Sequence, residues 1–268
     1  MDLERRQFLA ISIATLMASQ ARGAEPARVI TPITLGAAIN KAGRQRMLTQ
    51  RMAKAYAMQV LAIMPERALS LLDQSRKLFE LQLLELATMV PNEAIQATLD
   101  KLAVQWASYR QLLLKPPQKS ALPEIMQTSE ACLAVAHTLT GLYEKQAGTP
   151  AGQLVNISGR QRMLSQRMAK CYLIIQSGAA VSGVNEQMSA AHKEFVSALA
   201  TLNAANENTA EIRTDLGLAN TQWLFFEQAL SGNERVKEIA LRNVVTTSER
   251  ILEVMDSLTG RYEKLVRS

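Results

Sequence analysis

The chain has 268 residues and a formal net charge of +6, and 48% of its residues are hydrophobic but only 4% aromatic. This apolar content is ample for a core and allows one large or two modest domains. An isoelectric point near 9.4 would suit a nucleic-acid partner, but so few aromatic side chains for base stacking argue against one.

The first 23 residues have the features of an export signal. Arg5 and Arg6 begin a twin-arginine pattern, which a short apolar run and then small residues follow. Cleavage after Ala21 or after Gly23 fits the pattern equally well. Later apolar runs stay below the ~18 residues that a membrane-spanning helix needs. We therefore expect a soluble periplasmic protein exported by the twin-arginine route, with a basic N-terminal helix as the alternative.

Clusters of proline, glycine and asparagine divide the remaining chain into eight expected helices. They cover residues 35–64, residues 65–89, a third helix ending before Pro116, residues 123–145, residues 153–176, residues 184–202, a seventh helix ending near Leu230, and a last helix reaching about residue 266. Ser231 and Glu234 have the spacing of a capping box for the last helix. Four helices per half with short connections predict an all-α fold of two tandem up-down four-helix bundle modules, residues 30–147 and 153–268.

Both halves begin with nearly the same twelve residues. Gly43–Lys54 reads GRQRMLTQRMAK, and Gly159–Lys170 reads GRQRMLSQRMAK. The halves also end alike, because HTLTGLYEK at residues 137–145 aligns with DSLTGRYEK at residues 256–264. This pattern indicates tandem duplication of a whole module, and each repeated block lies in a stretch that is free of Asp and Glu.

Helical spacing places the arginines of each block on different faces. Arg44 and Arg51 lie nearly in line, whereas Arg46 points almost oppositely, on a face of small residues that another helix could approach closely. Pairing of the two first helices across a pseudo-twofold axis would bring Arg46 and Arg162 together. Two such guanidinium groups repel each other unless an anion lies between them. Alternatively, the arginines pair with acids of neighbouring helices or extend to solvent.

A small planar oxyanion is the ligand that this arrangement favours, because arginine offers a rigid fork of donors that matches planar oxygens. Glycine beside the contact would leave room for the ligand. The predicted ligand-binding residues are Arg46, Arg162, Gly43, Gly159, Arg44, Arg160, Arg51 and Arg167.

The repeated block resembles the signature of the type IV pili methyl-accepting chemotaxis transducer N-terminal domain, the PilJ type. It is also similar to the periplasmic ligand box of nitrate/nitrite sensor histidine kinases. That resemblance implies a four-helix sensor in which two first helices meet in a homodimer and the arginine before the first Met grips nitrate. This arginine is Arg46 in one half and Arg162 in the other. The kinases have small or apolar residues at Arg44 and Arg160, and they carry membrane helices and a cytoplasmic output.

Other chemistry has little support in the sequence. His137 aligns with Asp256 and His192 with Arg76, so the two histidines share no site, and a metal would need more ligands. Helically spaced methionines fit a core better than a copper site. Cys132 and Cys171 fit either two buried apolar side chains or a bridge. We expect no enzyme activity, no metal and no cofactor.

These observations favour a periplasmic protein that binds a small anion, nitrate or nitrite first, and signals through a membrane receptor or sensor kinase. Two modules in one chain would imitate the kinase homodimer internally, although pairing between chains stays open. The alternative is an adaptor that docks such a partner through the small-residue faces without binding a ligand. A third interpretation is weak contact with anionic lipid head groups.

Overall fold

The computed structural model describes residues 31–266, and this part of the chain is helical. The helices of the first half are α2 (Leu35–Val60), α3 (Pro65–Leu86), α4 (Glu93–Leu113), the short 3-10 helix η1 (Lys119–Ala121) and α5 (Leu122–Ala147). Those of the second half are α6 (Pro150–Ser177), α7 (Val184–Asn203), α8 (Ala210–Leu230) and α9 (Lys237–Leu265). Residues 31–266 contain no strand, so the prediction of an all-α fold with two tandem bundles is confirmed. The expected export signal lies outside the described residues.

Polar caps and glycines set the helix ends near the predicted breaks. The Thr34, Asn92 and Thr149 side chains accept hydrogen bonds from backbone N–H groups in the first turns of α2, α4 and α6. Gly148 and Gly178 end α5 and α6 with φ of 60° and 65°, a conformation that favours glycine. The connection from α5 to α6 is consequently very short.

The expected capping box at the last helix is wrong. The residue before α9 is Val236, which supplies no side-chain cap, and the Ser231 hydroxyl donates to the Gln228 carbonyl at the end of α8 instead. The reason is that the chain first turns through Gly232, whose φ is 69°, so α9 begins several residues later than the spacing suggests.

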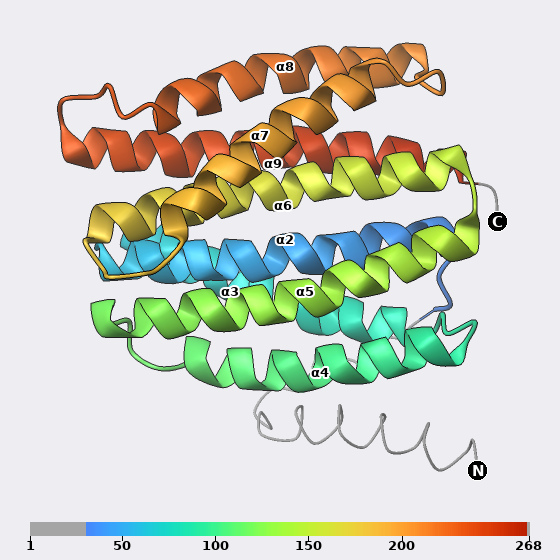
Figure 1. The fold of residues 1–268 in the computed structure, drawn as a ribbon, viewed down its shortest axis with the longest axis horizontal. Coiled ribbons are helices and arrows are strands. Elements are labelled where there is room, and N and C mark those ends of the chain that lie inside the picture. The colour runs from blue at the N-terminus through green and yellow to red at the C-terminus, as the bar shows by residue number, and fades with distance from the viewer. Residues whose placement is uncertain (1–30, 267–268) are drawn as a thin grey trace.

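The two halves repeat one packing scheme. In each half the first helix packs against the second and the fourth, and the third packs against the fourth. The first helices, α2 and α6, form the most extensive helix pair of the molecule and run side by side in the same direction at its centre (Figure 1). We call this contact between α2 and α6 the seam. The last helix of each half also contacts the first helix of the other half.

Equivalent aromatic pairs fill the two cores. Phe79 stacks on Trp106 with ring centroids 4.3 Å apart, and Phe195 stacks on Trp223 at 4.2 Å. Burial of such large rings is a main apolar contribution to the stability of each half. Cys132 and Cys171 are both free thiols in the core. Among the helices of residues 31–266, none is long and apolar enough to cross a membrane.

Candidate functional site

Two arginines meet at the seam, one from each repeated block. Arg46 of α2 and Arg162 of α6 are fully buried. A Cβ atom on Gly43 would lie 3.1 Å from Nη2 of Arg46 and 3.6 Å from Nη2 of Arg162. The same two distances, with the arginines exchanged, hold at Gly159. The two guanidinium groups therefore lie close together, in space that the two glycines leave open.

Each of these guanidinium groups reaches across the seam to the backbone of the other half. Nη2 of Arg46 donates to the Asn156 carbonyl at 3.2 Å, and Nη2 of Arg162 donates to the Asn40 carbonyl at 3.1 Å. Arg162 also donates to the Asn40 side chain, Oδ1, at 2.8 Å. Among the described residues, Nε of Arg46 and Nε of Arg162 have no hydrogen-bond partner. Neutral carbonyl groups thus provide much of the solvation of two buried positive charges.

The second half supplies a carboxylate to this site. Asp256 of α9 accepts from Nη1 of Arg162 and from Nε and Nη2 of Arg44, the last at 2.6 Å. The arginines come from opposite halves, so the Asp256 carboxylate bridges α2 and α6. Burial opposes ionisation of Asp256, but these two arginines hold its pKa below the usual value.

The first half places a histidine where the second half has this carboxylate. His137 of α5 is the repeat counterpart of Asp256. Its Nδ1 lies 3.3 Å from Nη1 of Arg46 and 3.3 Å from Nη1 of Arg160. Burial, Arg46 and Arg160 lower the pKa of His137, which favours a neutral ring that accepts from both arginines.

Arg46 consequently differs from the other arginines of the site. Arg160 forms a two-pronged ion pair with Glu194 of α7, whose repeat counterpart is the apolar Leu78. No carboxylate of residues 31–266 lies within 4.0 Å of the Arg46 guanidinium. Burial, together with Arg160 and Arg162, lowers the pKa of Arg46 to about 9. Because arginine stays protonated in proteins, this shift chiefly reflects the cost of burying the charge, which Glu144 and Glu194 offset in part.

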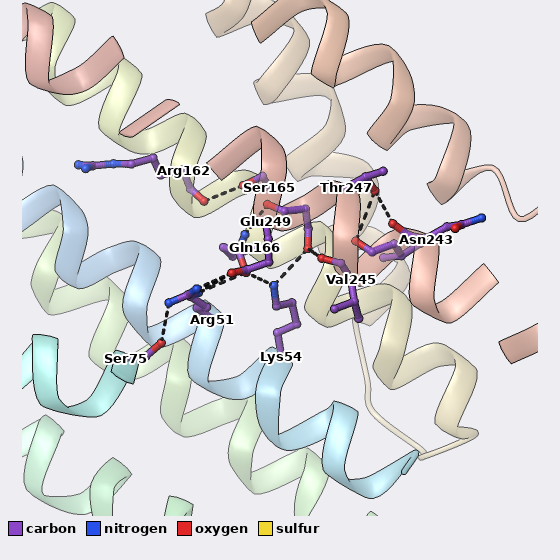
Figure 2. A network of polar contacts seen from close by, with 12 residues as sticks. Arg51, Lys54, Ser75, Arg162, Ser165, Gln166, Asn243, Val245, Thr247 and Glu249 are labelled. Carbon is purple, nitrogen blue, oxygen red and sulfur yellow. Dashed lines mark hydrogen bonds and ion pairs between the residues drawn. The ribbon is translucent and has the colours of Figure 1, made fainter. Parts of the chain in front are cut away.

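The later arginine of each block lies outside this site. Arg51 pairs with Glu249 of α9, which also accepts from the buried Lys54, as Figure 2 shows. Arg51 follows Arg44 by about two helical turns, and its Nη1 donates to Ser75. We predicted Arg51 as a ligand-binding residue from the sequence, whereas in the structure its guanidinium group is paired with the Glu249 carboxylate.

Arg167 repeats this arrangement in the other direction. Arg167 and the buried Lys170 of α6 both donate to Glu130 of α5. Glu130 and Glu249 are counterparts in the repeat, and each belongs to the half opposite to its basic partners. These contacts lock the halves together, and they leave Arg167, like Arg51, already engaged by an acid.

Other residues that occupy equivalent positions in the two blocks contribute to helix packing. Gln45 and Gln161 donate to the backbone carbonyls of Phe79 and Phe195 in the second helix of their own halves. Thr49 and Ser165 mark the one difference between the blocks, and both hydroxyls donate to the carbonyl three residues earlier. The two glutamines of the repeat therefore hold the first helix of each half against the second.

The sequence alone did not identify the acids and the histidine that contact the arginines of the two blocks. Asp256, His137, Glu130 and Glu249 all lie on the last helices, outside the repeated blocks. A signal for them is present in the alignment of the two last helices, in which His137 is aligned with Asp256 and Glu130 is aligned with Glu249. His, Cys, Asp and Glu side chains of residues 31–266 form no group of three that could hold a metal ion.

The comparison with protein families gives one match in each half. The model described as type IV pili methyl-accepting chemotaxis transducer N-term, PilJ, matches residues 34–129 and 147–252. Together these regions cover more than half of the chain. No curated protein and no solved structure matches the chain.

Proposed function

Because the chain belongs to the PilJ family of type IV pili methyl-accepting chemotaxis transducer N-terminal domains, we propose that it senses a small oxyanion. The ligand binds at the arginine cluster, which we define as Arg44, Arg46, Arg160 and Arg162. Nitrate and nitrite are the first candidates. The observation that supports this proposal is Arg46, a fully buried guanidinium group that has no carboxylate of residues 31–266 within ion-pair distance.

The charge of the cluster favours an anion. Of the described carboxylates, only Asp256 and Glu194 form ion pairs with its four arginines. A bound anion would replace neutral carbonyl acceptors by charge-assisted hydrogen bonds, which are roughly twice as strong as neutral ones. Burial of the site strengthens each of these bonds further. A planar monoanion fits the guanidinium fork better than a point charge does.

Binding at the seam also suggests how occupancy becomes a signal. The cluster joins α2 and α6, so an anion there changes the balance of charge between the two halves. A ligand that prefers one packing of α2 against α6 shifts the population toward it. The protein works in the periplasm after export by the twin-arginine route, and a membrane receptor or sensor kinase reads this change. The family consists of signalling modules, so no catalytic step is proposed.

The adaptor function is the second candidate, and exposed apolar side chains favour it. Leu224 and Phe225 of α8 are 64% and 51% exposed, and Val236 and Ile239 at the start of α9 are 51% and 44% exposed. Such side chains are typical of docking surfaces when they gather in one patch. In the adaptor model these exposed side chains contact the partner, and the arginine cluster serves structure alone.

Titration calorimetry with nitrate, nitrite, sulfate and phosphate tests the sensor function. We expect saturable heat from at least one planar monoanion, lost in the double variant Arg46→Ala/Arg162→Ala. Arg242→Ala is the matched control, because Arg242 is exposed and pairs with Glu238 one turn away. The sensor proposal is abandoned if the wild type gives no heat above dilution with any of the four anions. Retained partner binding by the double variant would then support the adaptor.

A further inference from the structure

The second half shows which kind of acceptor the arginines of the cluster bind. Asp256 Oδ1 receives N–H groups from the seam arginine of its own half, Arg162, and from Arg44 of the opposite half. His137 Nδ1 occupies the equivalent place between Arg46 and Arg160, again one arginine from each half. On both sides one acceptor thus lies between an arginine of each half, but this acceptor is a carboxylate on one side and a neutral ring on the other.

This difference leaves Arg46 without an ion-paired carboxylate, because the carboxylate of the first side, Glu194, pairs with Arg160. Glu194 occupies Nε and Nη2 of Arg160, whereas Nη1 of Arg160 points to His137. Arg46 has no ion pair with any carboxylate of residues 31–266, and its Nε has no hydrogen-bond partner there. A neutral imidazole nitrogen accepts hydrogen bonds but adds no charge. The Nη1 donors of Arg46 and Arg160 thus converge on a weak acceptor.

We propose that a planar monoanion of carboxylate size binds between Arg46 and Arg160, in the place that the Asp256 carboxylate takes on the other side. This inference rests on the proposed function and locates its ligand. Oxygens of the anion accept from Nη1 of the two arginines, whereas on the other side Oδ1 of Asp256 accepts from both Arg162 and Arg44. Because Asp256 fills the second side, each chain binds one anion.

His137 connects this site with the surface. Arg46 is fully buried, but His137 is an exposed residue and its contact with Arg160 lies at the surface. In this proposal an anion enters from solvent when the imidazole turns aside, which is a change of side-chain rotamer. The displaced ring stays close enough to donate to the anion once it is protonated.

The test exchanges the two residues that distinguish the sides. His137→Asp supplies an internal carboxylate to Arg46 and Arg160, so calorimetry should show nitrate and nitrite affinity at least about tenfold weaker than in the wild type. Asp256→His removes the carboxylate between Arg162 and Arg44, and the stoichiometry should rise from one anion per chain toward two. His192→Asn, at the remote histidine that contacts Glu227 of α8, should bind like the wild type.

The outcomes separate this inference from the proposed function. If the wild type binds an anion and folded His137→Asp binds it with the same affinity, the inference is overturned and the sensor function still stands. Absence of binding in the wild type removes both. If Asp256→His fails to fold, as judged by circular dichroism, the affinity of His137→Asp still decides. Lost binding in a folded His137→Asp chain with a raised melting temperature supports the site.

Discussion

Arg51 of α2 and Glu249 of α9 form an ion pair that joins the two halves of the chain (Figure 2). Arg167 and Glu130 form the same pair in the opposite direction. Each glutamate also accepts from a lysine that is completely buried, Lys54 or Lys170. The halves are thus tied by two equivalent three-residue ion networks on either side of the seam, and their loss should affect stability more than ligand binding.

Glu249→Gln should destabilise the protein strongly, because it leaves the buried Lys54 without a counterion. Removing one partner of a buried ion pair costs about 3–5 kcal/mol. Urea unfolding followed by circular dichroism measures this free energy. The control is Glu238→Gln, whose exposed pair with Arg242 on the same helix is worth less than ~0.5 kcal/mol. Equal losses in the two variants would contradict a stabilising role of the network between the halves.

The same network predicts acid sensitivity. Burial alone would raise the pKa of Glu249, but Lys54 and Arg51 hold it down to about 2, against an ordinary value of 4.5. A lowered pKa in the folded state stabilises the protein above the unfolded value, and this contribution disappears as the pH falls from 4.5 toward 2. The melting temperature should therefore fall over this range, and less steeply in Glu249→Gln than in the wild type. Parallel curves would show that Glu249 does not cause the loss.

Gly43→Ala should disturb the arginine cluster. The added methyl group would stand 3.1 Å from Nη2 of Arg46, which has to move away. We expect weaker anion binding in calorimetry and less stabilisation than an alanine normally gives in a helix. Gly141→Ala is the control, because no described atom lies within 4 Å of a Cβ there. It should gain roughly 0.5–1 kcal/mol from helix propensity and keep the anion affinity. Similar behaviour of the two variants would show that Gly43 has no spatial role.

Anion binding should strengthen as the pH falls. His137 faces Arg46 of α2, Arg160 and Arg167 of α6, and Glu194 of α7; burial and the arginines lower its pKa below 6.5. A bound anion offsets the arginines and raises this pKa, so binding takes up a proton and the affinity increases as the pH falls from the pKa of the anion-bound state toward the lower pKa of the free state. Calorimetry between pH 7.5 and 5.5, values of about one unit on either side of an ordinary histidine pKa, checks this dependence. His137→Gln should flatten it, and a flat curve in the wild type would exclude coupling to His137.

The sequence predicts the architecture well because its signals are local. Prolines and glycines mark the helix ends, and helical spacing correctly sets Arg46 apart from Arg44 and Arg51. The block does not reveal which acids meet its arginines, because those partners come from α5, α7 and α9 through tertiary packing. The alternative interpretation, arginines paired with acids of neighbouring helices, describes the other arginines of the two blocks, namely Arg44, Arg51, Arg160, Arg162 and Arg167. Arg46 has no ion pair among the described residues, and anion binding there stays a prediction.

The connection from α5 to α6 consists of Gly148 and Thr149 alone, so the two copies of the module are tethered at very high effective concentration. A receptor assembled from two identical subunits falls apart on dilution, and each subunit must use the same residue at a given position. Fusion removes both constraints. Assembly becomes independent of protein concentration, and a single codon change can give one copy an acid while its twin keeps a histidine.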